Sequence, residues 1–132
     1  MNALVGPFHA SHRFDRVLEG LHIDEIGDGR AKASLEVQQG TANAFETLHG
    51  GASCTLVDVM GTLALLSVDS TRPGVSVDIN ISFLLAAKVG DKLSIEGSVL
   101  KSGKKLGFTE VTILREHDQK VLAVGRHTKA FV

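Results

Sequence analysis

Residues 46–70, ETLHGGASCTLVDVMGTLALLSVDS, decide how this chain folds. From residue 47 to residue 68 the stretch carries one formal charge, Asp58, among Leu, Val, Met, Ala and Gly. It lacks proline and runs for about 17 residues from Gly50, so it predicts a helix rather than a strand. Apolar side chains cover most of the circumference of such a helix, and other elements must therefore wrap around it.

Strand patterns flank this helix on both sides. Before it, residues 21–26 and 30–37 predict two strands joined by a Gly27-Asp28-Gly29 turn. After it, residues 75–83 alternate between apolar and polar side chains, which predicts a strand with one apolar and one polar face. Further strands are expected over about residues 91–101, 105–115 and 120–130. We therefore expect an α+β fold, with an antiparallel sheet wrapped around one long central helix.

The length of the chain limits the number of domains. At 132 residues the sequence suits one domain with a substantial core and is too short for two ordinary ones. We therefore expect residues 1–132 to form a single domain. Residues 1–20 form an N-terminal extension, in which apolar spacing and a following glycine predict a short amphipathic helix over residues 11–20.

Composition and charge exclude several classes of function. Six Phe without Trp or Tyr offer few stacking platforms, and a net charge of -1 gives no bulk attraction to nucleic acid or to an anionic membrane. The central helix is nearly long enough to span a bilayer, but its midpoint Asp58 and its Ser, Thr and Gly residues indicate a buried core helix. The six His show no metal-type spacing, so no metal site is expected.

The single cysteine bears on the compartment. Cys54 rules out an internal disulfide and fits a reducing compartment, and we expect it to be a small core residue rather than an activated thiol. The first residues lack the charged and apolar segments of a secretory signal. An intracellular protein is therefore expected, with the cytoplasm favoured and the mitochondrion or another organelle left open.

Charge is distributed unevenly along the chain. Residues 1–83 carry five basic and ten acidic side chains, whereas residues 84–132 carry nine basic and five acidic ones, a local balance of about +4. Two interpretations of the basic part stay open at this point. It forms solvated strand faces, or it forms a surface for a phosphorylated ligand.

Asp58 is the first residue that points to chemistry. A buried carboxylate without a partner is costly, so we expect Asp58 to face a cavity or an interface. The alternative is a carboxylate at an exposed helix edge, or one that binds a backbone amide. Gly50 and Gly51 are the second feature, because the unpaired N–H groups of a helix N-terminus suit a developing oxyanion. The alternative there is a tight entry from loop to helix.

The separation of these two features restricts how they act. Eight residues with a rise of about 1.5 Å each place Asp58 roughly 12 Å from Gly50 along the helix axis. One helix cannot apply both groups to the same bond. A two-fold dimer with antiparallel central helices would bring Gly50 of one subunit near Asp58 of the other, which gives two composite sites.

Two other patterns carry less weight. Residues 51–55, GASCT, nearly match the nucleophile elbow of serine hydrolases, but Thr55 replaces the final glycine and no strand precedes the motif. His127 lies in the run GRHTK and is interpreted as a strand residue with no special role.

Several motifs together resemble one enzyme family. They are NAFETLHGG at 43–51, TLVD at 55–58, PGVSVDIN at 73–80, VLKSGK at 99–104 and GRHTK at 125–129. In register over about residues 35–130, this pattern resembles the hot-dog-fold acyl-CoA thioesterases, in the group that includes phenylacetate-pathway thioesterases and eukaryotic thioesterase superfamily members. The resemblance implies an antiparallel sheet around a helix, paired into homodimers and commonly into dimers of dimers. It also implies hydrolysis of acyl-CoA thioesters to free acid and CoA, in fatty acid metabolism, without metal or organic cofactor.

The resemblance also assigns catalytic roles. Asn43 and the Gly50 amide would polarise the thioester carbonyl, while His49 would order that loop and hydrogen-bond to Asn43. Asp58 of the facing subunit would activate water as general base, with Ser76 helping to position the water. Direct attack by the Asp58 carboxylate through an anhydride is the alternative.

The same resemblance places the substrate. It would lie along the polar face that bears Ser76 and Asp78, and CoA would lie over residues 83–88 and over the turn at residues 101–106. The basic part of the chain would then bind phosphate groups. The residues implied in substrate and CoA binding are Asp78, Phe83, Leu84, Lys88, Lys101, Ser102, Gly103, Lys104, Lys105 and Leu106.

The chain departs from the family pattern at two positions. Glu46 stands where relatives carry glycine, and Ala86 stands where they usually carry proline. Both positions lie in loops, so they bear on substrate preference and on the CoA loop more than on the reaction. Two alternatives to a thioesterase stay open: a non-catalytic acyl-CoA-binding module, and a hot-dog hydratase or dehydratase of acyl thioesters.

Overall fold

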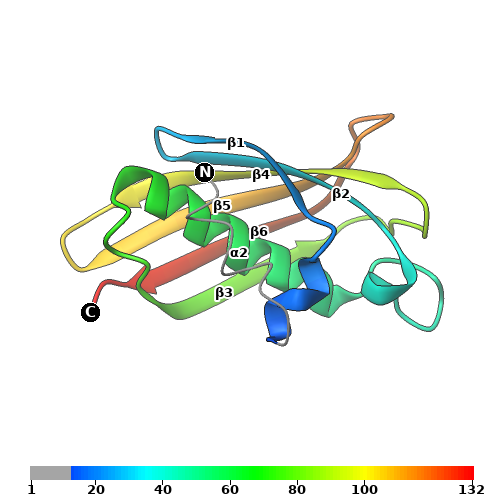
Figure 1. Ribbon diagram of the computed structural model, residues 1–132, viewed down its shortest axis with the longest axis horizontal. Coiled ribbons are helices and arrows are strands. Elements are labelled where there is room, and N and C mark those ends of the chain that lie inside the picture. Colours follow the sequence, from blue (N-terminus) through cyan, green and yellow to red (C-terminus); the bar gives the residue numbers. More distant parts are fainter. Residues whose placement is uncertain (1–12) are drawn as a thin grey trace.

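A computed structural model describes residues 13–132 as one six-stranded sheet that curves around one long helix. The elements are the 3-10 helices η1 (Phe14–Leu18) and η2 (Gln39–Thr41), the helix α2 (Gly50–Val68), and the strands β1 (His22–Gly27), β2 (Arg30–Glu36), β3 (Val75–Phe83), β4 (Lys92–Ser102), β5 (Leu106–Arg115) and β6 (Val121–Ala130). Neighbouring strands are antiparallel, in the order β1-β2-β4-β5-β6-β3. Figure 1 shows α2 lying across one face of this sheet. The predicted α+β architecture is confirmed.

The N-terminal helix differs from the prediction. The structure has a five-residue 3-10 helix, Phe14–Leu18, instead of an amphipathic α-helix over residues 11–20. Arg13 at its start provides no side-chain cap, and Leu18 is its one buried residue, so little stabilises a longer helix. The rest of the expected extension, residues 1–12, lies outside the described residues.

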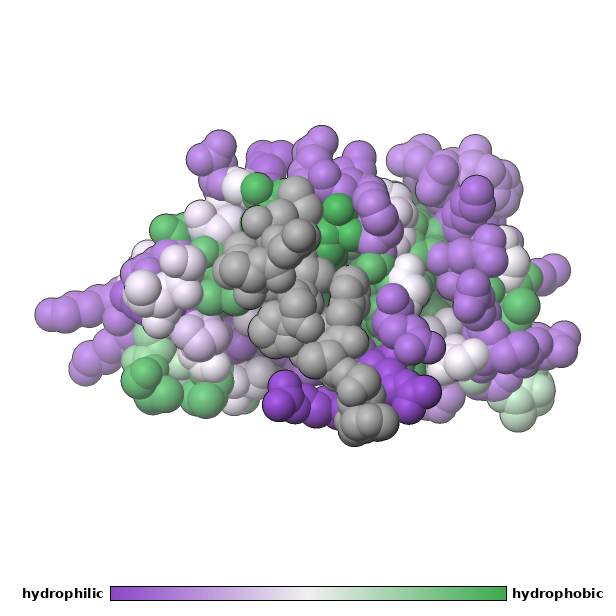
Figure 2. All heavy atoms as spheres, viewed as in Figure 1, coloured by the Kyte–Doolittle hydropathy of each residue, from purple (hydrophilic) through white to green (hydrophobic). Residues whose placement is uncertain are grey.

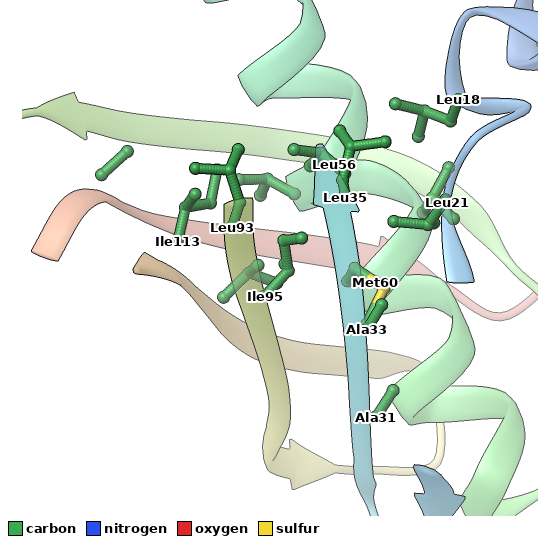
Figure 3. Packing of buried hydrophobic residues seen from close by; sticks show 14 of the residues in the cluster. Leu18, Leu21, Ala31, Ala33, Leu35, Leu56, Met60, Leu93, Ile95 and Ile113 are labelled. Atoms are coloured by element: carbon green, nitrogen blue, oxygen red, sulfur yellow. The ribbon is translucent and has the colours of Figure 1, made fainter. Parts of the chain in front are cut away.

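Helix α2 supplies the centre of the hydrophobic core. Leu56, Met60 and Leu63 are fully buried, and Figure 3 shows Leu56 and Met60 among side chains of β2 and β4. Within residues 13–132, α2 is the one helix long and apolar enough to cross a membrane, but 72% of that apolar stretch is buried inside the molecule. It is therefore a core helix, as the sequence indicates.

Glycine allows α2 to approach the sheet closely. A Cβ atom on Gly125 of β6 would lie 2.6 Å from Val57 of α2, and one on Gly61 of α2 would lie 2.6 Å from the Thr109 hydroxyl of β5. Contacts this short are not tolerated, so a larger residue at either position would push the helix away from the sheet. The close approach brings polar side chains of β5 and β6 against the middle of α2.

Strand β3 lies at one edge of the sheet and pairs with β6 alone. Its apolar residues are poorly covered in the single chain, because Val75, Val77 and Phe83 are each more than half exposed. Figure 2 shows apolar residues gathered at the lower left, near the C-terminus and the start of β3.

A β-bulge at Val77 interrupts the alternation of β3. Ser76 pairs with Lys129, whereas Asp78 pairs with Thr128, so the register shifts between the two. Residues that pair across a ladder point to the same face, and Lys129 and Thr128 point to opposite faces. Ser76 therefore faces α2 and Asp78 faces away from it. The expectation of one polar face bearing both residues is wrong, because the extra residue reverses the side on which Ser76 lies.

Candidate active site

The loop that precedes α2 is held by the side chain of Asn43. Its Oδ1 accepts hydrogen bonds from the backbone N–H of Phe45 at 2.9 Å and of Thr47 at 3.1 Å, and its Nδ2 donates to the Thr47 hydroxyl at 2.9 Å. These bonds form an Asx-type turn over residues 43–47. They leave Asn43 one free N–H, because a side-chain amide has two. Glu46, at the bend of this turn, adopts a positive φ of 61°.

His49 caps the N-terminus of α2. Its Nδ1 accepts a hydrogen bond from the Gly51 N–H at 2.8 Å, and its carbonyl accepts from Ala52 and Ser53. Within residues 13–132 the Gly50 N–H has no acceptor, so it remains free at the positive end of a 19-residue helix. The expected hydrogen bond between His49 and Asn43 is not formed, since each side chain is bonded to other groups. We call residues 43–51 the loop half of the site.

Asp58 lies at the edge of α2, facing β3 and β6. Its side chain is 47% exposed in the single chain, and its Oδ1 is 3.9 Å from Nε2 of His127. The carboxylate is therefore not enclosed by its own chain. In the single chain, Asp58 therefore matches the alternative of a carboxylate at an exposed helix edge. The expected interface around Asp58 would require a second copy of the chain.

His127 of β6 faces Asp58 from inside the molecule. It is fully buried, and its Nε2 lies 2.8 Å from the Ser76 hydroxyl. The interpretation that His127 has no special role is therefore wrong in structural terms. The signal that could have identified it is the two-residue period of β6, which places His127 on the same face as the buried Ala123 and Gly125.

Lys129 lies two residues further along β6, on the same face. Its side chain is buried, and its Nζ donates a hydrogen bond to the Thr62 hydroxyl at 2.8 Å. That hydroxyl in turn donates to the backbone carbonyl of Asp58 at 2.8 Å. A buried ammonium group is thus connected through one side chain to the turn of α2 that carries the carboxylate. We call Asp58, Thr62, Ser76, Thr109, His127 and Lys129 the buried half of the site, after the four that are buried; Asp58 and Ser76 lie at its open edge.

Burial and neighbouring charges shift the pKa values of His127 and Lys129, the two basic groups of the buried half. Burial lowers the pKa of His127, the nearby Asp58 carboxylate opposes this shift, and the Lys129 ammonium reinforces it. Burial also lowers the pKa of Lys129, again with Asp58 opposing. Desolvation disfavours the charged form of both side chains. His127 is therefore a neutral hydrogen-bonding group near pH 7.

The two segments expected to bind CoA lie at opposite ends of α2. Phe83 is beside Gly50, where an added Cβ would be 3.5 Å from the Phe83 ring, and Lys88 forms an isolated bridge with Thr47 of the loop half. The turn at residues 101–106 lies at the other end, where Arg72 donates a hydrogen bond to the Gly103 carbonyl at 2.7 Å. Figure 1 shows the same separation. One chain therefore does not bring the two expected segments together.

Other features of the described residues do not join this site. No group of three or more His, Cys, Asp or Glu in residues 13–132 could hold a metal ion. Cys54 is half-buried and free. An open hollow of about 710 Å³ over β1, β2 and β4 is lined by residues such as Arg30, Lys32 and Glu96, and contains none of the residues assigned above.

Comparison with known proteins gives consistent results. The family model of the thioesterase superfamily matches residues 45–122. Human acyl-coenzyme A thioesterase 13 is 41% identical over 119 residues, which cover 90% of this chain and 85% of the human protein. The crystal structure of zebrafish thioesterase superfamily member 2 has 37% identity and a TM-score of 0.92, covering 99% of this chain and 92% of that one. The mouse structure has 36% identity and a TM-score of 0.89, covering 98% and 95%.

Proposed function

The chain belongs to the thioesterase superfamily and is a thioester hydrolase with the hot-dog fold, and from this premise we propose that its substrates are acyl-CoA thioesters, which it cleaves to a free acid and CoA. The observation that carries the proposal is the position of Asp58. Its carboxylate lies at the exposed edge of a core helix, with Ser76 and His127 beside it. A carboxylate that is reachable from outside and surrounded by hydrogen-bonding groups suits a general base.

The proposed reaction uses one water molecule. Asp58 takes a proton from the water while its oxygen attacks the thioester carbonyl carbon. Negative charge then develops on the carbonyl oxygen, where the free N–H groups of Gly50 and Asn43 stabilise it. The carbon–sulfur bond breaks as this intermediate collapses, and the CoA sulfur leaves and gains the proton. Ser76 gives the water a second hydrogen-bonding partner, which favours a general base over direct attack by Asp58.

The site requires a second copy of the chain. Gly50 and Asp58 lie roughly 12 Å apart along one helix, and the two CoA segments lie at its opposite ends. Strand β3 has a free edge and exposed apolar side chains, which suit pairing with another strand. We infer a two-fold homodimer through β3, in which Gly50 and Asn43 of one subunit act with Asp58 of the other. Association into a dimer of dimers follows from the family resemblance alone.

Replacement of Asp58 tests the proposed chemistry. Turnover of Asp58→Asn is expected to fall by about 10²–10⁴-fold, because the base is lost while the shape of the side chain is kept. Release of CoA thiol is measured over short, long and aromatic acyl-CoAs, alongside size-exclusion chromatography. Asp28→Asn is the control, because it removes one carboxylate from an exposed turn where asparagine also accepts the positive φ of 52°.

Each result of this experiment separates the candidate functions. Unchanged turnover in Asp58→Asn rules out the assignment of the base. If the unaltered protein binds acyl-CoA and releases no thiol, the chain is a binding module. Hydration of an enoyl-CoA without thiol release would instead indicate a hydratase.

A mixing experiment tests the composite site. Co-expressed Asp58→Asn and Asn43→Ala subunits form a mixed dimer that keeps one site with both halves intact. With random pairing, half of the dimers are mixed and each has one working site, so activity returns to about a quarter of the unaltered level. If both halves came from one subunit, the mixture would have no more activity than the two variants measured separately.

A further inference from the structure

The reaction proposed above leaves the most deeply placed charge of the site without a role. Lys129 is only 6% exposed, and lysine is rarely buried without a partner because the ammonium group loses its hydration. Its Nζ is hydrogen-bonded to the neutral Thr62 hydroxyl, and no carboxylate in residues 13–132 forms a direct ion pair with it. A hydrophobic residue would fill this position without the desolvation cost of an ammonium group, so the presence of a charge here needs an explanation.

The structure around His127 indicates what that charge acts on. Nε2 of His127 lies 2.8 Å from the Ser76 hydroxyl and 3.9 Å from the Asp58 carboxylate. Its Nδ1 is buried with no hydrogen-bond partner among the described residues, and a Cβ on Gly61 would lie 3.2 Å from it. A protonated imidazole would carry an N–H at both nitrogens, and the one at Nδ1 would have no acceptor. The packing of α2 against β6 therefore favours a neutral ring with its proton on Nε2.

The charged groups near His127 shift the pKa of its imidazole in opposite directions. Burial is the largest cause that disfavours an imidazolium, and the Lys129 ammonium on β6 reinforces it. Asp58 from α2 favours an imidazolium, and so, more weakly, does Asp78 of β3 from the other face of the sheet. Strand β5 contributes the Thr109 hydroxyl, which donates to the His127 carbonyl and carries no charge. If His127 became charged, the resulting imidazolium would attract the Asp58 carboxylate and compete with the water that this carboxylate must activate.

We propose that Lys129 is a positioning residue of the water-activating site: its buried ammonium group, held by Thr62, prevents His127 from pairing with Asp58 and leaves the imidazole to orient the Ser76 hydroxyl. With Nε2–H donated to Ser76, the hydroxyl proton of Ser76 points away from His127. Thr62 has a second effect, because its bond to the Asp58 carbonyl holds the turn that carries the base. This inference rests on the proposed function, which assigns Asp58 and Ser76 to the reaction.

Replacement of Lys129 by methionine tests the proposal, since it removes the charge and keeps the length. We expect the acid limb of kcat/KM to move up by about one pH unit, the effect of one nearby charge, with a loss of activity that approaches about tenfold at pH values below the limb. Activity on the alkaline plateau should stay within about threefold of the unaltered enzyme. The His127 imidazole signal, assigned by its loss in His127→Gln, should titrate at a higher pH in the NMR spectrum.

Two controls separate this effect from general ones. Lys120→Met makes the same change in net charge at an exposed position in the β5–β6 turn, and is expected to leave the acid limb in place. Lys129→Arg keeps the charge and is expected to keep the acid limb. If Lys129→Met fails to fold, Thr62→Val takes its place, because it removes the acceptor that fixes the ammonium group and should move the limb in the same direction.

The proposal is overturned by a folded Lys129→Met or Thr62→Val variant whose acid limb and His127 titration are both unchanged. A uniform loss of kcat at every pH would also overturn it, because a merely structural role gives that result. Failure of the proposed function looks different: Asp58→Asn would keep its turnover, while the NMR titration of His127 would still report whether Lys129 controls the imidazole.

Discussion

The loop half and the buried half of the site are organised in different ways. The loop half is held by hydrogen bonds between residues two to four positions apart, such as Asn43 to Thr47 and Gly51 to His49. The buried half is held by bonds that span 51 residues, from Ser76 to His127, and 67 residues, from Thr62 to Lys129. The first can form in an isolated segment, whereas the second exists only when α2, β3 and β6 are assembled. Damage to the loop half should therefore affect activity, and damage to the buried half should affect folding as well.

The largest expected effect tests whether the loop half contributes to activity without supporting the fold. We expect Asn43→Ala to lower kcat by about 100-fold, because it removes a donor to the developing oxyanion. Its free energy of unfolding should fall by no more than about 1 kcal/mol, because the lost bonds lie in a partly exposed loop at the surface. Turnover and thermal unfolding are measured together. Thr47→Val, which keeps the amide but loses its hydroxyl partner, should lose several-fold in kcat. A drop in Tm of more than about 8 °C in Asn43→Ala would show that the loop supports the fold.

The next effect tests how tightly the buried half is packed. Gly61→Ala places a methyl group 2.6 Å from the Thr109 hydroxyl and 3.2 Å from Nδ1 of His127, and we expect it to destabilise the fold by about 2 kcal/mol. Gly50→Ala is the matched control in the same helix, because its methyl group meets the Phe83 ring at an ordinary 3.5 Å. Urea unfolding measures both. Equal stabilities of the two variants would mean that α2 can move away from the sheet at little cost.

A smaller effect tests the cap between loop and helix. We expect His49→Ala to lower stability by about 1 kcal/mol, because the Gly51 N–H loses its acceptor. His49→Asn should recover most of this loss, since asparagine is among the best N-cap residues. Circular dichroism during urea unfolding measures the difference. If alanine and asparagine behaved alike at this position, His49 would contribute through something other than its cap.

The smallest effect concerns the strained turn of the loop half. Glu46 adopts a φ of 61°, which glycine tolerates better, and we expect Glu46→Gly to stabilise the protein by about 0.5 kcal/mol. Gln119, with a φ of 57° in the β5–β6 turn, is the control outside the site, and Gln119→Gly should give a similar gain. Differential scanning calorimetry can resolve the change in both. A loss of stability in Glu46→Gly alone would show that its side chain makes a compensating contact.

The sequence predicts most of the fold because its signals are periodic. Helix α2 and six strands lie within a few residues of their expected positions, since each has a long and consistent pattern. The short N-terminal helix differs, because a brief pattern without a cap does not specify the type of helix. The strand order is also not predictable from periodicity. Strand β3 pairs with β6, at the end of the sheet, although the short connection from β3 to β4 would suggest that these two strands are neighbours.

The two halves of the candidate site also differ in how far the sequence predicts them. The loop half can be identified in the sequence because its residues are consecutive and their hydrogen bonds are local. The two-residue period of β6 places His127 and Lys129 on its buried face, but their partners, Ser76 and Thr62, are defined only when β6 packs against β3 and α2. Alternation alone places Ser76 on the wrong face for a related reason, since it gives no sign of the extra residue in β3.

The bulge at Val77 has a consequence for comparing this chain with its homologues. Because one inserted residue decides whether the serine faces the helix or the solvent, a single-residue gap at this point in an alignment is not neutral. A homologue that has the serine but lacks the insertion would present its hydroxyl on the opposite face. The number of residues between the Pro-Gly at 73–74 and the end of β3 would therefore distinguish homologues that can position the hydroxyl from those that have the serine on the wrong face.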